Sequence, residues 1–202
     1  MPYAVHSSPF AQRSTPYLSQ MNGRFNQAMN CVPTVLTMMV ARFNPAKLSP
    51  GARGDDVIDK ISYAMRSLDG SPGVSGLASM RTLGVLGDQL GLRLWKRPGI
   101  DLDELARALM SGQQQAMVIG DAYALPYARP DEMARAPYED AGHVIAVTGF
   151  DRMRQLFMVN DPGQPARRAT TMTPQELGQF VGYLNHNLDG GVGGCTIYVS
   201  AA

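Results

Sequence analysis

The sequence predicts a single α+β domain in which an N-terminal helical part packs on a C-terminal antiparallel sheet. Apolar residues recur at helical spacing in the first half of the chain, whereas short alternating or continuous apolar runs dominate the second half. The 202 residues suffice for one well-buried core, and no change in composition indicates a second. Residues 1–15 show no pattern, so we expect a flexible arm followed by one domain over residues 16–202.

Four helices are expected in the first half of the chain. Their apolar faces predict helices over 31–43, over 55–68, over 77–90 and from Asp101 onward. Asn30 is a good N-cap for the first helix, and Pro33 fits its first turn. Asp101 and Glu104 have the spacing of a capping box.

The second half of the chain carries the expected sheet. Its apolar runs predict strands over 116–120, 143–150 and 156–160, and a last strand around Cys195. A helix begins after Thr173, with Pro174 in its first position and Glu176 completing a capping box. The loop over 121–142 is long enough to suggest a functional role, and its tyrosines are candidates for lining a substrate cleft.

Cys31 is the candidate nucleophile. A cysteine attacks as the thiolate, and the first turn of a helix favours negative charge, so its position predicts a lowered thiol pKa. Taken alone, Cys31 would more often be a buried structural cysteine. Cys195 is interpreted as such a residue, because a Cys31–Cys195 disulfide would consume the proposed nucleophile.

His143 and Asp161 strengthen this interpretation. The strands over 143–150 and 156–160 are expected to pair about Met153 or Arg152, and the register centred on Arg152 places His143 directly opposite Asp161 at the open end of the hairpin. A carboxylate in that position would orient the imidazole and stabilise the imidazolium. Asn160 points to the other face in this register, so Asp161 is preferred as the orienting acid.

Gln20 is the candidate oxyanion donor. Its side-chain N–H₂ would act with the backbone N–H of Cys31 on the charge that develops during acyl transfer. A surface glutamine in a loop is the simpler explanation of the same residue. Gln27 is the alternative donor, although it lies close to Cys31 in sequence.

The composition argues against several classes of function. A net charge of +1 gives no electrostatic reason to bind nucleic acid or anionic lipid. No apolar run approaches the roughly 20 residues of a membrane span, and the N-terminus lacks the pattern of a secretory signal. We therefore expect synthesis in the cytoplasm, with any export requiring a specialised bacterial secretion system. Without metal-ligand spacing, a phosphate loop or a dinucleotide fingerprint in the sequence, no metal and no cofactor is expected.

Two stretches of the chain resemble a known family. The segments PYLSQMNG and NCVPTVLTMMVARF, together with HVIAVTGFD and LFMVNDP, are similar to the bacteriocin-leader (double-glycine) peptidase-like branch of papain-like cysteine proteases. Plant-pathogen avirulence effector proteases share this layout. The resemblance implies a papain-like fold, with Cys31 as nucleophile, His143 as base, Asp161 as orienting acid and Gln20 as oxyanion donor. Val32 departs from the family, which usually has Gly or an aromatic residue there.

The favoured function is a cysteine endopeptidase that cleaves a specific protein or peptide, as a secreted bacterial effector or toxin. If the protein is a toxin, an immunity or inhibitor protein is an expected partner. One alternative keeps the chemistry but makes the substrate a peptidoglycan peptide, and another is an inactive papain-like binding module. The presence of all four candidate residues argues against the inactive module.

Overall fold

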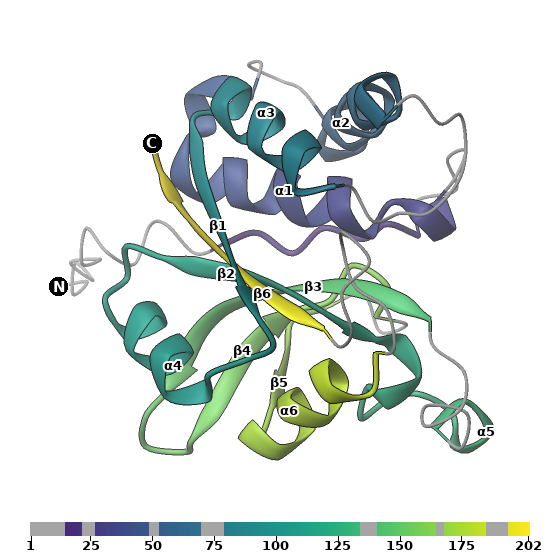
Figure 1. The fold of residues 1–202 in the computed structure, drawn as a ribbon, viewed down its shortest axis with the longest axis vertical. Coiled ribbons are helices and arrows are strands. Elements are labelled where there is room, and N and C mark those ends of the chain that lie inside the picture. Colours follow the sequence, from purple (N-terminus) through teal and green to yellow (C-terminus); the bar gives the residue numbers. More distant parts are fainter. Residues whose placement is uncertain are drawn as a thin grey trace, which may run out of the picture.

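A computed structural model describes residues 15–21, 27–48, 53–69, 79–133, 141–164, 168–184 and 194–202. Its centre is a six-stranded sheet in the order β1-β6-β2-β3-β4-β5, and every neighbouring pair is antiparallel. The strands are β1 (Leu92–Pro98), β2 (Gln115–Asp121), β3 (Gly142–Asp151), β4 (Leu156–Asn160), β5 (Thr170–Met172) and β6 (Cys195–Ala201). Figure 1 shows the sheet crossing the middle of the molecule.

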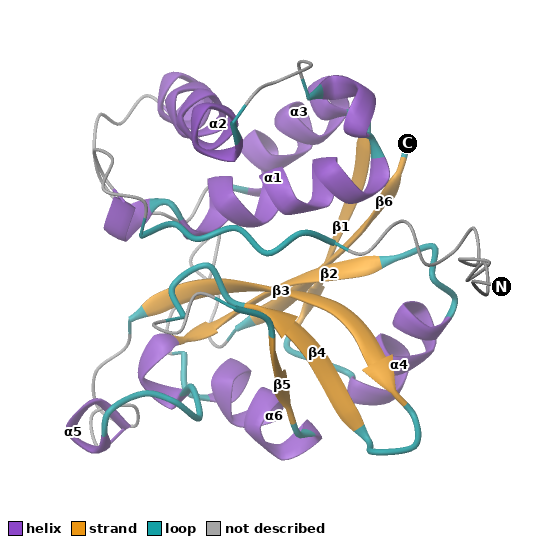
Figure 2. Cartoon of the chain, turned by 180° about the vertical axis from the view of Figure 1, so that it is seen from behind, coloured by secondary structure: helices purple, strands orange, loops and turns teal. Residues whose placement is uncertain are grey.

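Helices cover both faces of this sheet. They are α1 (Cys31–Phe43), α2 (Gly54–Asp69), α3 (Met80–Leu90), α4 (Leu102–Met110), α5 (Pro130–Met133) and α6 (Pro174–Gly182), with short 3₁₀ turns η1 (Gln27–Met29), η2 (Pro45–Lys47) and η3 (Ala122–Ala124). Figure 2 shows α1, α2 and α3 gathered on one side of the sheet and α4 and α6 on the other. This arrangement confirms the predicted α+β fold. None of the helices among the described residues is both long and apolar enough to span a membrane.

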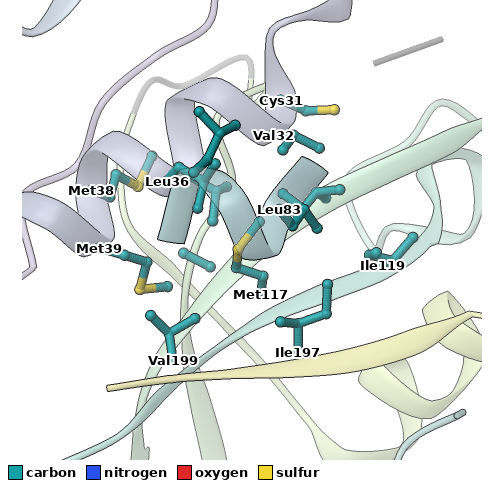
Figure 3. Close-up of a cluster of buried hydrophobic side chains, with 14 of the residues drawn as sticks. Cys31, Val32, Leu36, Met38, Met39, Leu83, Met117, Ile119, Ile197 and Val199 are labelled. Atoms are coloured by element: carbon teal, nitrogen blue, oxygen red, sulfur yellow. The ribbon is translucent and has the colours of Figure 1, made fainter. Parts of the chain in front are cut away.

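Alternation along the strands divides the interior into two cores. In β2, Met117 and Ile119 pack with α1, whereas Ala116 and Val118 belong to the core beneath α4 and α6. Helix α1 is the central helix, because its first ten residues are all buried. Figure 3 shows Cys31 at the edge of the first core, with its sulfur pointing away from Leu36.

The start of α1 differs from the sequence prediction. Asn30 precedes the helix, but its side chain makes no capping hydrogen bond. Its Oδ1 instead accepts a hydrogen bond of 2.9 Å from Ser62 Oγ of α2. The side chain before Cys31 is therefore used to hold α1 against α2. By contrast, the predicted capping box of α6 is present, with Thr173 and Glu176 each bonding the other's backbone.

Two strands were not predicted, and both form edges of the sheet. In β1, the burial pattern shows no alternation, and only Leu92 is buried. In β5, three residues are too few to produce a recognisable pattern. The predicted helix over 77–90 begins at Met80 in the described chain and ends at Leu90, and Gly91, with a φ of 68°, forms the left-handed cap that favours glycine. Residues 77 and 78 lie outside the described residues, as do the predicted arm up to residue 14 and residues 134–140 of the long loop.

The preferred register of the β3–β4 hairpin, centred on Arg152, is wrong, and the pairs nearest the site follow the alternative centred on Met153. Val147 pairs with Val159, and beyond a bulge between Val147 and Gly149 the pairing continues with Phe150 opposite Phe157. The turn comprises residues 152–155, one residue fewer than predicted, because β3 extends to Asp151. Asp151 Oδ1 accepts from two backbone N–H groups of that turn, and Gln155 has a φ of 55°. On the His143 side of the bulge, the pairing is shifted by an even number of residues. The side chains of β3 there therefore point to the face of the sheet expected from the sequence.

Candidate active site

His143 and Asp161 meet at the open end of the β3–β4 hairpin. The Nε2 atom of His143 lies 2.6 Å from Oδ1 of Asp161, and both side chains are buried. Asp161 comes directly after β4, so its carboxylate reaches the imidazole from the following turn and not from a paired strand position. Because a carboxylate only accepts, Nε2 carries the hydrogen and Nδ1 is left as the basic nitrogen of the neutral ring.

The turn after β4 packs closely on the imidazole. The backbone N–H of Gly163 donates to Oδ1 of Asp161 at 2.7 Å. A Cβ atom on Gly163 would lie 3.3 Å from Cε1 of His143, which is closer than most side chains tolerate. A glycine at this position therefore lets the backbone hold the carboxylate and touch the ring at the same time.

Tyr127 also reaches this carboxylate, a contact that the sequence does not predict. Its hydroxyl donates a hydrogen bond to Oδ2 of Asp161. Tyr127 belongs to the long loop between β2 and β3, and the length and tyrosine content of that loop were the available signals. Neither signal indicates which residue the hydroxyl would bind, because the partners are 34 positions apart.

Cys31 is the first residue of α1 and is almost completely buried. The position was predicted to lower its pKa, but burial raises the pKa of the thiol to about 11. A backbone hydrogen bond from Val144 opposes this rise, and the negative charge of Asp161 adds to it. The Cys31 thiol therefore lies at Val144, the residue after His143 in β3, and within electrostatic reach of Asp161.

Burial also determines the resting charges of the pair. It lowers the pKa of the His143 imidazole to about 4, and it raises the pKa of the Asp161 carboxyl to about 7, against the effect of the Gly163 N–H. In mildly basic solution the site therefore holds a neutral thiol, a neutral imidazole and a carboxylate. For Cys31 to act as a thiolate nucleophile, its proton would have to pass to the imidazole.

Gln20 links the segments that carry the other candidates. Its backbone N–H donates to the carbonyl of Pro162, the residue after Asp161, at 2.9 Å. Its side-chain Nε2 lies 3.1 Å from the carbonyl oxygen of Gln27 and 3.3 Å from that of Ala28, in the 3₁₀ turn before Cys31. Its buried Oε1 has no hydrogen-bond partner among the described residues. The side chain of Gln20 is thus close to the start of α1, whereas Gln27 takes part through its backbone carbonyl.

Two further residues are placed away from the pair. Asn160 directs its Nδ2 to the carbonyls of Thr15 and Pro16, each at 3.3 Å, and not to His143. Cys195 is fully buried in β6, and neither it nor Cys31 forms a disulfide.

Replacing Gln20 by alanine is expected to lower kcat by roughly 10²–10³-fold, the usual effect of losing one oxyanion donor. KM should change little, because the oxyanion exists only in the transition state. Steady-state kinetics of Gln20→Ala, with the exposed Gln113→Ala as the matched control, measure this effect. An unchanged kcat would transfer the role to Gln27 or to backbone groups alone.

Comparisons with known proteins identify a family and related folds. The model of the Peptidase C39-like family matches residues 12–183. A C39-like peptidase from Bacillus anthracis is 14% identical, with a TM-score of 0.56 over 95% of this chain and 96% of the other. The peptidase domain of Streptococcus ComA, a bifunctional ABC transporter involved in quorum sensing, is 12% identical, with a TM-score of 0.51 over 94% of this chain and all of that domain.

At these identities the two structures show a shared fold. No curated protein matches the sequence. The family match covers most of the chain and includes all four candidate residues. The chain belongs to the Peptidase C39-like family and is a papain-like cysteine protease.

Proposed function

We propose that the protein hydrolyses peptide bonds in a specific protein or peptide substrate with a Cys31–His143–Asp161 triad. The observation that carries this proposal is the buried hydrogen bond of 2.6 Å between His143 Nε2 and Asp161 Oδ1, beside the helix that begins at Cys31. It leaves Nδ1 of His143 as the base for the thiol. A chain that only binds peptides would not need this paired, buried arrangement.

Catalysis then follows the usual course of acyl transfer to a thiol. Nδ1 of His143 takes the proton of Cys31 as the sulfur attacks the substrate carbonyl carbon. Gln20 Nε2, by turning one N–H away from the carbonyl of Gln27 or Ala28, and the backbone N–H of Cys31 stabilise the negative oxygen of the tetrahedral intermediate. The imidazolium returns its proton to the leaving amine, and a thioester remains on Cys31. Water, deprotonated by His143, hydrolyses the thioester and restores the thiol.

The substrate determines which finer role this chemistry serves. We favour a secreted bacterial effector or toxin, because residues 16–43 and 142–163 resemble the avirulence effector proteases. In that role the protein would leave the producing cell through a specialised secretion system, and a toxin would have an immunity or inhibitor protein as partner. An amidase acting on peptidoglycan peptides uses the same thiol chemistry and is the alternative.

A comparison of two thiol variants tests the proposal. Wild type, Cys31→Ala and Cys195→Ala are each incubated with a whole-cell lysate, and new protein N-termini are mapped by mass spectrometry. New termini are expected with wild type and Cys195→Ala but not with Cys31→Ala, since both changes remove one buried thiol and only Cys31 lies at the site. Purified cell-wall fragments form a second substrate arm, and release of their peptides alone would favour the amidase. Equal cleavage by Cys31→Ala would refute the assigned nucleophile.

A further inference from the structure

Both oxygens of the Asp161 carboxylate are held, and they are held by different parts of the chain. Oδ1 accepts from Nε2 of His143 and from the backbone N–H of Gly163. Oδ2 accepts from the hydroxyl of Tyr127. A carboxylate fixed at one oxygen can still turn about its Cβ–Cγ bond, so the bond from Tyr127 determines which oxygen faces the imidazole.

Tyr127 is held in place by the base of its loop. Asp121, the last residue of β2, accepts hydrogen bonds from the backbone of Tyr123 at 2.9 Å and of Ala141 at 3.1 Å. These two bonds join the beginning of the loop to its end. Leu125 is buried in the core beneath α4 and α6, and the Tyr127 ring packs against the same core. The hydroxyl is therefore presented to Asp161 by a fixed scaffold and not by a freely rotating side chain.

We propose that Tyr127 is a positioning residue of this site, whose hydroxyl holds Oδ2 of Asp161 so that Oδ1 stays directed at Nε2 of His143. The inference rests on the proposed roles of His143 and Asp161, and it assigns a purpose to the long loop before β3. Tyr127 touches neither the substrate nor the reacting sulfur in this assignment. It acts through the carboxylate alone.

The hydroxyl also has an electrostatic effect on the same carboxylate. The titratable groups that bear on Asp161 are His143 from β3, Tyr127 from the loop and Cys31 from α1. Burial raises the pKa of Asp161 to about 7, and a donor to its charged form opposes that rise. Loss of the Tyr127 hydroxyl should therefore raise the pKa of Asp161 further. Because the working enzyme needs the carboxylate, activity would then be lost at a higher pH as the solution is acidified.

The substitution Tyr127→Phe removes this hydroxyl and keeps the ring. We expect kcat/KM at pH 7 to fall about 10- to 100-fold, mainly through kcat, and the acid limb of the pH–rate profile to move up by about one pH unit. Tyr183→Phe, the same change on a partly exposed residue at the end of α6, should leave both unchanged. A uniform loss at every pH, with no movement of the limb, would mean that Tyr127 only packs, and it would overturn the proposal.

A second pair of measurements separates this inference from the proposed function. In an Asp161→Ala background the Tyr127→Phe change should alter kcat/KM by less than about threefold, because no carboxylate remains to be held. In substrate-free protein, the ¹⁵N signals of the His143 ring should report the ionisation of Asp161 at a higher pH in Tyr127→Phe than in wild type. This shift in a protein that cleaves nothing would support the positioning role and refute the peptidase. Peptidase activity without this shift would support the peptidase and refute the positioning role of Tyr127.

Discussion

Replacing His143 by alanine is expected to lower kcat/KM by a factor of about 10⁴ to 10⁶, the range found when a triad loses its base. The reason is the state of Cys31, whose thiol has a pKa raised to about 11 by burial. Without an imidazole to accept the proton, almost no thiolate forms at neutral pH. The remaining oxyanion donors cannot compensate, because they act only after the sulfur has attacked.

The measurement is kcat/KM on a peptide that contains the mapped cleavage site, with circular dichroism and thermal unfolding to verify the fold. His143 is buried, so some loss of stability is expected and the assay temperature must stay well below the unfolding transition. Activity within tenfold of wild type in a folded His143→Ala variant would show that another group removes the proton.

Asp161→Ala is expected to reduce kcat/KM by about 10³-fold or more, yet less completely than His143→Ala. The carboxylate takes no part in bond formation, but it accepts hydrogen bonds from three donors: His143 Nε2, the Gly163 N–H and the Tyr127 hydroxyl. Alanine leaves all three donors without that acceptor. The imidazole then loses both its orientation and the charge that stabilises its protonated form.

Asp161→Asn should be milder, and the structure gives the reason. Two N–H donors meet at Oδ1, so the amide oxygen of asparagine would occupy that position. Its N–H₂ would then face the Tyr127 hydroxyl, whose oxygen can accept. Asn160→Ala serves as the neighbouring control and should change little, because Asn160 bonds the carbonyls of Thr15 and Pro16. If Asn160→Ala lost as much activity as Asp161→Ala, the orienting role would have been assigned to the wrong residue.

Local patterns in the sequence predicted most of the fold. The helix over 31–43 has the bounds expected, and the capping box of Thr173 and Glu176 is where the sequence placed it. The strands β1 and β5 escaped prediction because an edge strand needs no alternation and a three-residue strand shows no period. Strand pairing is a property of two segments and of the turn between them, so the bulge after Val147 left no signal in either strand alone.

The candidate site illustrates the same limit. His143 and Asp161 were expected to meet in a strand register that does not exist, and they meet because Asp161 reaches back from the turn. Because the pairing is shifted by an even number of residues there, His143 still lies on the face of the sheet that the sequence predicts. Burial was the other unpredicted quantity. A helix N-terminus lowers the pKa of a thiol, but the loss of water around Cys31 is the larger effect, and it depends on the whole fold.

The burial of Cys31 has a consequence for the chemical durability of the protein. Oxidation to sulfenic acid and reaction with disulfides both proceed through the thiolate and require access to the sulfur. With a pKa of about 11, roughly one Cys31 in ten thousand is a thiolate at pH 7, and its side chain is almost fully enclosed. An idle molecule is therefore expected to keep its thiol in an oxidising environment. Exposed thiols of lower pKa would be oxidised there before any substrate arrived.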